Sequence, residues 1–319
     1  MKAKKNKKTG IIVFSIIVIL ALGIVALYFF QGRTKKDPSV KFSSSEFIAA
    51  IYVEGVLENR NTSYNQEWLL TTIDNLKNNS KNVGIALFIN SPGGGVYQSD
   101  EVYLALQDYK TANKKVYAYM GSLAASGGYY ISCAAEKIYA NRNTLTGSIG
   151  VIAGQSFDMT ELMYNIGIES ETFFAGRNKN MLNFNQPVTQ EQREIMQGIA
   201  DECYKQFVGI VSTQRKLPSE KVLELADGRI YTAYQALQNG LIDKIDSWEN
   251  MIEDLRDDLQ NPECKVKTFK VIQKQSFLDK LLTSQSEANN TKIAAQLGIP
   301  LSVYKELSEP IPYPAYLYK

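Results

Sequence analysis

Residues 83–95, VGIALFINSPGGG, decide the fold class of this chain. Residues 83–89 are a short, almost continuous apolar run, which is typical of a strand buried on both faces of a parallel sheet. The run leads into a turn at 90–95, and the pattern then predicts a helix over 98–109 and another strand over 116–120. This order of elements indicates an α/β fold in which crossover units cover a mainly parallel sheet.

The same alternation continues on both sides of this stretch. Further elements are predicted as a strand at 47–53 and helices at 67–78, 124–135, 190–216 and 233–238. From residue 261 onward lysine and serine become more frequent, and three prolines punctuate an aromatic end. We therefore expect one folded α/β domain over 46–260. A polar linker at 31–45 precedes it, and a C-terminal extension at 261–319 follows it.

The N-terminus has the features of a membrane anchor. Five lysines lie in residues 1–10, and residues 11–30 contain no charge. About 20 apolar residues are enough to cross a bilayer as a helix, and the aromatic end at 28–30 suits a membrane interface. A cleaved signal peptide is the alternative, although its apolar part is usually shorter. The positive-inside rule then places residues 1–10 in the cytoplasm and the domain outside.

Charge and composition exclude several classes of function. Without the five N-terminal lysines, the chain has fewer basic residues than its 33 acidic ones, so nothing favours nucleic-acid binding. The three cysteines are widely spaced and form no metal or disulfide pattern, and Cys133 is expected to be a small core residue. The chain has no histidine, which excludes imidazole bases and histidine-bearing zinc sites.

A serine nucleophile is nevertheless suggested by residues 121–128, GSLAASGG. Ser126 at the start of a helix would place its oxygen near amide donors, and its small neighbours leave room for a substrate. The alternative is that Ser126 only caps the helix. Two other glycine-rich turns, 91–95 and 146–150, follow neighbouring strands. The first could supply oxyanion-binding amides or be a plain turn, and it lacks the lysine of a nucleotide-binding loop.

Without histidine, the base would be a lysine or a carboxylate. The lysines between Ser126 and the end of the long helix at 190–216 are Lys137, Lys179, Lys205 and Lys216. A lysine acts as a base only when burial lowers its pKa from about 10.4, and sequence does not show burial. Lys205 and Lys216 belong to an amphipathic helix and are expected to face solvent, but spacing alone does not choose the base.

Four ordered motifs resemble the signal peptide peptidase group of peptidase family S49, in its short, single-copy bacterial form. They are residues 91–95 (SPGGG), 120–130 (MGSLAASGGYY), 145–150 (LTGSIG) and 226–229 (ADGR) with 240–243 (GLID). The resemblance covers about 47–258 and implies a ClpP/crotonase-like α/β fold and a Ser-Lys protease. By position it implies Ser126 as nucleophile, Lys179 as base, and Ser148 as the residue that holds the lysine. The implied oxyanion hole is made by the amides of Gly93, Gly94 and Gly127.

The function expected from this resemblance is a membrane-anchored serine endopeptidase that degrades residual signal peptides and needs no metal or cofactor. Its expected partners are apolar, extended peptides, the lipid bilayer and further copies of the chain in a homo-oligomeric ring. A non-catalytic membrane scaffold with the same fold is the main alternative, and an acyl-CoA enzyme is a third that the outward topology disfavours. The C-terminal residues 309–319 are expected either to dock in the substrate groove or to be disordered.

Overall fold

A computed structural model describes residues 45–271 and 315–317 of the chain. Within these residues eight strands form one sheet, in the order β7-β6-β4-β2-β1-β9, with β5 between β4 and β8 on a side branch. The strands of this sheet are β1 (Phe47–Glu54), β2 (Asn82–Ser91), β4 (Lys115–Ala125), β5 (Lys137–Ala140), β6 (Leu145–Gly147), β7 (Ile230–Thr232), β8 (Lys244–Ile245) and β9 (Lys265–Phe269). Within the described residues, neighbouring strands of this sheet pair in parallel except β6 with β7, which confirms the predicted α/β class.

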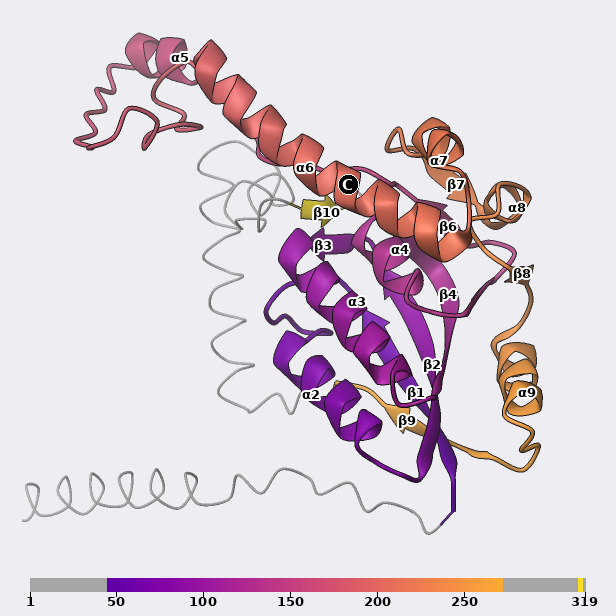
Figure 1. Cartoon of the computed structure of the whole chain (residues 1–319). Helices are drawn as coiled ribbons and strands as arrows, with labels where there is room; N and C mark the ends of the chain where they lie inside the picture. Colours follow the sequence, from indigo (N-terminus) through magenta and orange to yellow (C-terminus); the bar gives the residue numbers. More distant parts are fainter. Residues whose placement is uncertain (1–44, 272–314, 318–319) are drawn as a thin grey trace, which may run out of the picture. The chain divides into compact units, whose positions relative to one another are not determined.

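Helices cover both faces of the sheet (Figure 1). They are α2 (Gln66–Lys77), α3 (Val96–Lys110), α4 (Gly127–Ser132), α5 (Thr160–Asn165), α6 (Gln190–Arg215), α7 (Ser219–Leu225), α8 (Ala233–Gln238) and α9 (Trp248–Asp258). Local sequence sets their ends: Thr189 and Gln192 form a capping box at the start of α6, and Lys216 adopts a left-handed conformation at its end. The predicted helices at 190–216 and 233–238 are thus confirmed to within a residue.

The core lies on both faces of the sheet because side chains alternate along each strand. On β2, Ile85 and Leu87 belong to the cluster beneath α2, α3, α4 and α6, whereas Ala86 points into a second cluster beneath α9. Tyr117, Tyr119 and Tyr139 make most of the aromatic bulk of that second cluster. Removing a fully buried leucine such as Leu87 from such a core costs about 2–5 kcal/mol.

The structure corrects one boundary that matters for the site. The sequence predicted a helix from residue 124, but β4 continues to Ala125 and α4 begins only at Gly127. Ala124 is paired with Ser91 of β2 on one side and Thr146 of β6 on the other. These sheet hydrogen bonds outweigh the weak helix preference of the small residues, and they carry the strand up to the residue before Ser126.

The ends of the chain bear on the expected domain limits. The sheet includes β9, so it continues beyond residue 260, where the domain was expected to end. The expected anchor at 11–30 and almost all of the expected linker at 31–45 lie outside the described residues. In the part that the structure describes, no helix combines the length and apolar character needed to span a membrane.

Candidate active site

Three glycine-rich segments meet at one edge of the sheet. β2, β4 and β6 are parallel neighbours, and their carboxyl ends are in register, with Ser91 opposite Ala124 and Ala125 opposite Gly147. The carboxyl edge of parallel strands is where α/β proteins place their sites. The three segments were expected at strand ends, and the structure brings them together.

Ser126 sits in a sharp strand-to-helix turn. It has φ 53° and ψ −117°, a left-handed conformation that is strained for a residue with a Cβ. Its backbone N–H donates to the carbonyl of Gly147 at 2.7 Å, and its own carbonyl accepts the N–H of Tyr130 at 2.8 Å. Its side chain makes no capping bond to α4, so capping does not explain this serine. Strain held by surrounding hydrogen bonds is typical of a functional residue.

A short glycine strand, β3 (Gly93–Gly95), lies beside this turn and depends on the absence of side chains. A Cβ on Gly94 would lie 2.0 Å from the carbonyl oxygen of Leu57. Leu57 donates to the carbonyl of Gly93 and accepts the N–H of Gly95, both at 2.8 Å, so it occupies one edge of β3. The sequence did not reveal this role of Leu57, because the bonds are made by its backbone.

The other edge of β3 is occupied by the C-terminal strand β10 (Ala315–Leu317). The two strands are antiparallel, with Tyr316 opposite Gly94 and Leu317 opposite Gly93. Because Leu57 uses the carbonyl of Gly93 and the N–H of Gly95, the N–H and C=O of Gly94 point to the β10 edge. Docking of the tail is therefore confirmed for 315–317, whereas the rest of 309–319 lies outside the described residues.

Two further glycine amides belong to the segments around Ser126. Gly93 has φ 103° and donates its N–H to the hydroxyl of Ser91 at 3.1 Å. Gly127 is the first residue of α4, where backbone N–H groups have no intrahelical acceptor. A Cβ on Gly128 would lie 2.7 Å from the carbonyl oxygen of Ser91, so the end of β2 packs directly against the start of α4. Such amides can stabilise a developing oxyanion.

The four lysines considered as the base differ in their position relative to Ser126. Lys137 begins β5, forms an ion pair with Asp258 at 3.2 Å and lies over the ring of Tyr117. It is registered with Tyr117, near the start of β4, whereas Ser126 follows the end of that strand. Lys205 and Lys216 are exposed, as predicted. None of these three is placed to serve Ser126 of its own chain.

Lys179 is exposed in a turn that precedes α6. We refer to residues 152–189, which include α5 and this turn, as the arm. Figure 1 shows α5 and its flanking loops at the outer end of α6, away from α4. Among the hydrogen bonds of the described residues, none links Lys179 to Ser126 or Ser148. Within one chain the structure does not bring the expected nucleophile and base together.

The arm leaves many large apolar side chains exposed. They include Phe157, Leu162, Tyr164, Ile166, Ile168, Phe173, Phe174 and Phe184, with Phe173 87% and Tyr164 84% exposed. The half of α6 next to the arm buries only Gln192, whereas Phe207, Val208 and Val211 of the other half pack into the core. So many exposed large apolar side chains in one segment are typical of an interaction site.

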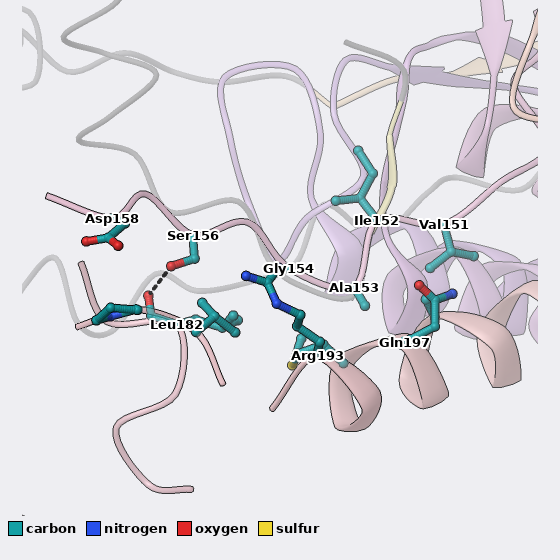
Figure 2. A pocket seen from close by; sticks show the side chains of 13 residues that line it. Val151, Ile152, Ala153, Gly154, Ser156, Asp158, Leu182, Arg193 and Gln197 are labelled. Atoms are coloured by element: carbon teal, nitrogen blue, oxygen red, sulfur yellow. Dashed lines mark hydrogen bonds between the residues drawn. The ribbon is translucent and has the colours of Figure 1, made fainter. Parts of the chain in front are cut away.

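Two adjoining cavities lie along α6. The larger, of about 690 Å³, is bounded by the segment from Val151 to Asp158, by Leu182, and by Arg193 and Gln197 of α6 (Figure 2). The smaller, of about 540 Å³, is lined by Ser148, Asp227, Gly228 and Tyr204 and shares Val151 with the first. Ser148 has φ 50° and donates its backbone N–H to the carbonyl of Arg229 at 2.7 Å. Ser126 lines neither cavity, so both open beside the site rather than over it.

In the described part of the chain, no group of three or more Cys, Asp or Glu side chains is arranged to hold a metal ion. Burial raises the pKa of the Cys133 thiol to about 12, consistent with a core residue. The chemically distinctive feature is thus a strained serine flanked by glycine amides and by an extended peptide strand.

Known proteins are similar to this chain in amino-acid sequence. The sequence model of Peptidase family S49 matches residues 108–261. A protein of Enterococcus faecium described as a candidate signal peptide peptidase SppA is 31% identical over 255 residues, which are 78% of this chain and 74% of that protein. A candidate protease of Synechocystis sp. is 36% identical over 66% of this chain and 73% of its own length.

A chloroplastic serine protease SPPA of Arabidopsis thaliana is 33% identical over 60% of this chain and 28% of that protein. Among solved structures, the ClpP1 N165D mutant from Listeria monocytogenes is 17% identical, covers 64% of this chain and 94% of that chain, and has a TM-score of 0.45. The family match and the E. faecium relative together cover the strand ends, Ser126 and the arm. The chain therefore belongs to peptidase family S49, as a serine peptidase of the SppA type.

Proposed function

We propose that this chain is a membrane-anchored endopeptidase with a Ser-Lys dyad, and that Ser126 of one copy is served by Lys179 of another. The observation that carries the proposal is the pairing of β10 with the edge of β3 that Leu57 does not occupy, beside the strained Ser126. An extended peptide is the natural occupant of such an edge, because backbone pairing binds it without requiring a particular sequence. A substrate in the same position presents its carbonyl groups next to the nucleophile.

The chemistry follows from the groups at this edge. The neutral amine of Lys179 takes the proton of the Ser126 hydroxyl, and Oγ attacks the carbonyl carbon of the peptide. The carbonyl electron pair moves to oxygen, where the N–H groups of Gly93 and Gly127 stabilise it. We assign Gly94 to pairing with the peptide backbone, because its N–H points to the β10 edge.

The second half of the reaction uses the same base. The protonated Lys179 gives its proton to the departing amine as the C–N bond breaks, and an acyl-enzyme remains on Ser126. Water then loses a proton to Lys179 and attacks the ester carbonyl carbon. The C–Oγ bond breaks, Lys179 returns its proton to Oγ of Ser126, and the acid is released. Ser148 lines a cavity next to the turn that carries Ser126, where it could hold the incoming amine.

Sharing of the dyad is supported by the arm. Lys179 is exposed on an apolar arm at the outer end of α6, and a single chain leaves this arm without a partner among the described residues. Packing of the arm against a neighbouring copy in a closed ring would bury these apolar side chains. It would also bring Lys179 to the neighbour's cavity that Ser148 lines. The anchor at 11–30 and the apolar arm both favour apolar substrates near a bilayer, such as residual signal peptides.

The dyad is tested with the full chain in detergent and a fluorophosphonate probe. We expect labelling of wild type at Ser126 and none in Ser126→Ala; an unlabelled wild type would instead favour a non-catalytic scaffold. Inactive Ser126→Ala and Lys179→Ala chains, each with its own tag, are then mixed and co-purified. If each site uses two copies, random mixing restores about one quarter of wild-type activity, because one site in four receives both intact residues. No recovery in verified mixed oligomers would place both residues in one chain.

A further inference from the structure

The turn that carries Ser126 is continuous with a second unusual turn. Gly147 has φ 86° and Ser148 has φ 50°, so two consecutive residues are left-handed. The carbonyl of Gly147 accepts the Ser126 N–H at 2.7 Å, which means that the position of Gly147 determines the position of the nucleophile. Gly147 adopts a positive φ without a steric penalty because it has no Cβ, but Ser148 does not, so neighbouring contacts must hold Ser148 in this conformation.

The segment 225–231, which we call the brace, supplies that hold. β7 pairs antiparallel with β6, with Tyr231 opposite Thr146 and Ile230 opposite Gly147. The carbonyl of Arg229 accepts the N–H of Ser148 at 2.7 Å, immediately after the end of this ladder. The brace therefore contacts the backbone of both left-handed residues.

Tyr231 is the most specific part of the brace. A Cβ on Gly147 would lie 2.5 Å from the Cδ2 atom of the Tyr231 ring, so the ring packs directly on the backbone of Gly147. The ring is 6% exposed, and its hydroxyl donates to the carbonyl of Leu225 at 2.8 Å. A planar ring tied at its far end limits how far the Gly147 peptide can move.

An ion pair closes the brace on its solvent side. The guanidinium of Arg229 binds the carboxylate of Asp227, and the same carboxylate accepts the backbone N–H of Arg229 at 3.1 Å. Gly228 between them has φ 88°, which suits glycine at this turn. Arg229 holds the pKa of Asp227 down at about 2, so the pair stays charged throughout the working range of a peptidase.

We propose that the brace is a positioning element for the nucleophile, with Tyr231 as the positioning residue and the Asp227–Arg229 pair as its lock. Through Gly147, Tyr231 sets where the Ser126 backbone, and hence Oγ, stands relative to the Gly93 and Gly127 amides. The proposal rests on the proposed role of Ser126. A displacement of about 1 Å at a reacting atom lowers turnover about 10²-fold, which is the scale expected when the ring is lost.

The variants are Tyr231→Leu, which removes the ring, and Tyr231→Phe, which keeps it and removes only the hydroxyl. Tyr231→Leu should lower kcat about 10²-fold with KM changed less than about twofold, and slow fluorophosphonate labelling of Ser126 by a similar factor. Tyr231→Phe should recover most of the activity, and Asp227→Asn should fall between the two. Tyr234→Leu is the matched control, because Tyr234 lies three residues later on α8 and is 62% exposed.

A second measurement does not depend on catalysis. Hydrogen exchange of the peptide that contains the Ser126 amide, measured on the full chain in detergent, should speed up at least about tenfold in Tyr231→Leu and stay unchanged in Tyr234→Leu. If Tyr231→Leu only lowers the melting temperature, while kcat per labelled site and exchange at Ser126 stay at wild-type values, the brace is structural and the proposal is overturned. An unlabelled wild type would refute the role of Ser126 instead, and the exchange result would still decide whether Tyr231 holds the turn.

Discussion

Replacing Gly94 by alanine is expected to damage both the stability and the site of this chain. The new Cβ would lie 2.0 Å from the carbonyl oxygen of Leu57 and 2.6 Å from its nitrogen and carbonyl carbon. These are backbone atoms and cannot turn aside as a side-chain end can, so β3 and Leu57 must separate. Both hydrogen bonds between Leu57 and β3, each 2.8 Å long, are then lost.

The magnitude follows from those two bonds. A backbone hydrogen bond contributes about 1 kcal/mol net, and a buried group left without a partner costs about 1–3 kcal/mol. We therefore expect the free energy of unfolding to fall by about 2–4 kcal/mol and the melting temperature to fall by roughly 5–15 °C. Because β3 also carries the Gly93 amide, a shift of about 1 Å should lower kcat/KM about 10²-fold.

Gly209→Ala is the matched control. Gly209 lies inside α6, and a Cβ there would meet nothing within 4 Å. The same chemical change should stabilise the helix by up to about 1 kcal/mol and leave turnover unchanged. Thermal unfolding of the full chain in detergent, followed by tryptophan fluorescence, is measured beside peptide hydrolysis on the same samples. An unchanged melting temperature and turnover in Gly94→Ala would refute the close packing of Leu57 on β3.

Three further outcomes are expected. Deletion of 309–319 should raise turnover of a short fluorogenic peptide several-fold, because β10 occupies the edge of β3 that a substrate needs, and unchanged kinetics would make the tail a passive extension. Turnover should rise toward alkaline pH, because only a neutral amine accepts the serine proton; Lys179→Arg should then be inactive at every pH, and activity in it would place the base elsewhere. Burial raises the pKa of Cys133 to about 12, so its thiol should stay protonated below that pH and resist iodoacetamide at about pH 8 until urea unfolds the chain. Labelling of native Cys133 as fast as the half-buried Cys203 would contradict that burial.

Local patterns were sufficient for the order of elements, and they singled out Ser126 as the candidate nucleophile. Residues 83–89 were identified as a buried strand because a short, almost continuous apolar run is typical of a strand that is buried on both faces. Ser126 was singled out because its small neighbours leave room for a substrate and because a serine at the start of a helix lies near amide donors. The end of β4 was misjudged, since Ala124 and Ala125 have little preference of their own and follow the neighbouring strands.

Other parts of the site depend on contacts between backbones far apart in the sequence. Leu57 and β10 occupy the two edges of β3, and Arg229 holds Ser148 through its carbonyl group. Backbone hydrogen bonds look the same for every residue type, so such partners leave no signature in the sequence. The sequence by itself thus determined the α/β layout, the serine and the glycines around it. Only the tertiary structure decided that Lys179 stands apart from Ser126 within one chain, because the direction in which α6 carries the arm depends on packing against α4 and on no local pattern.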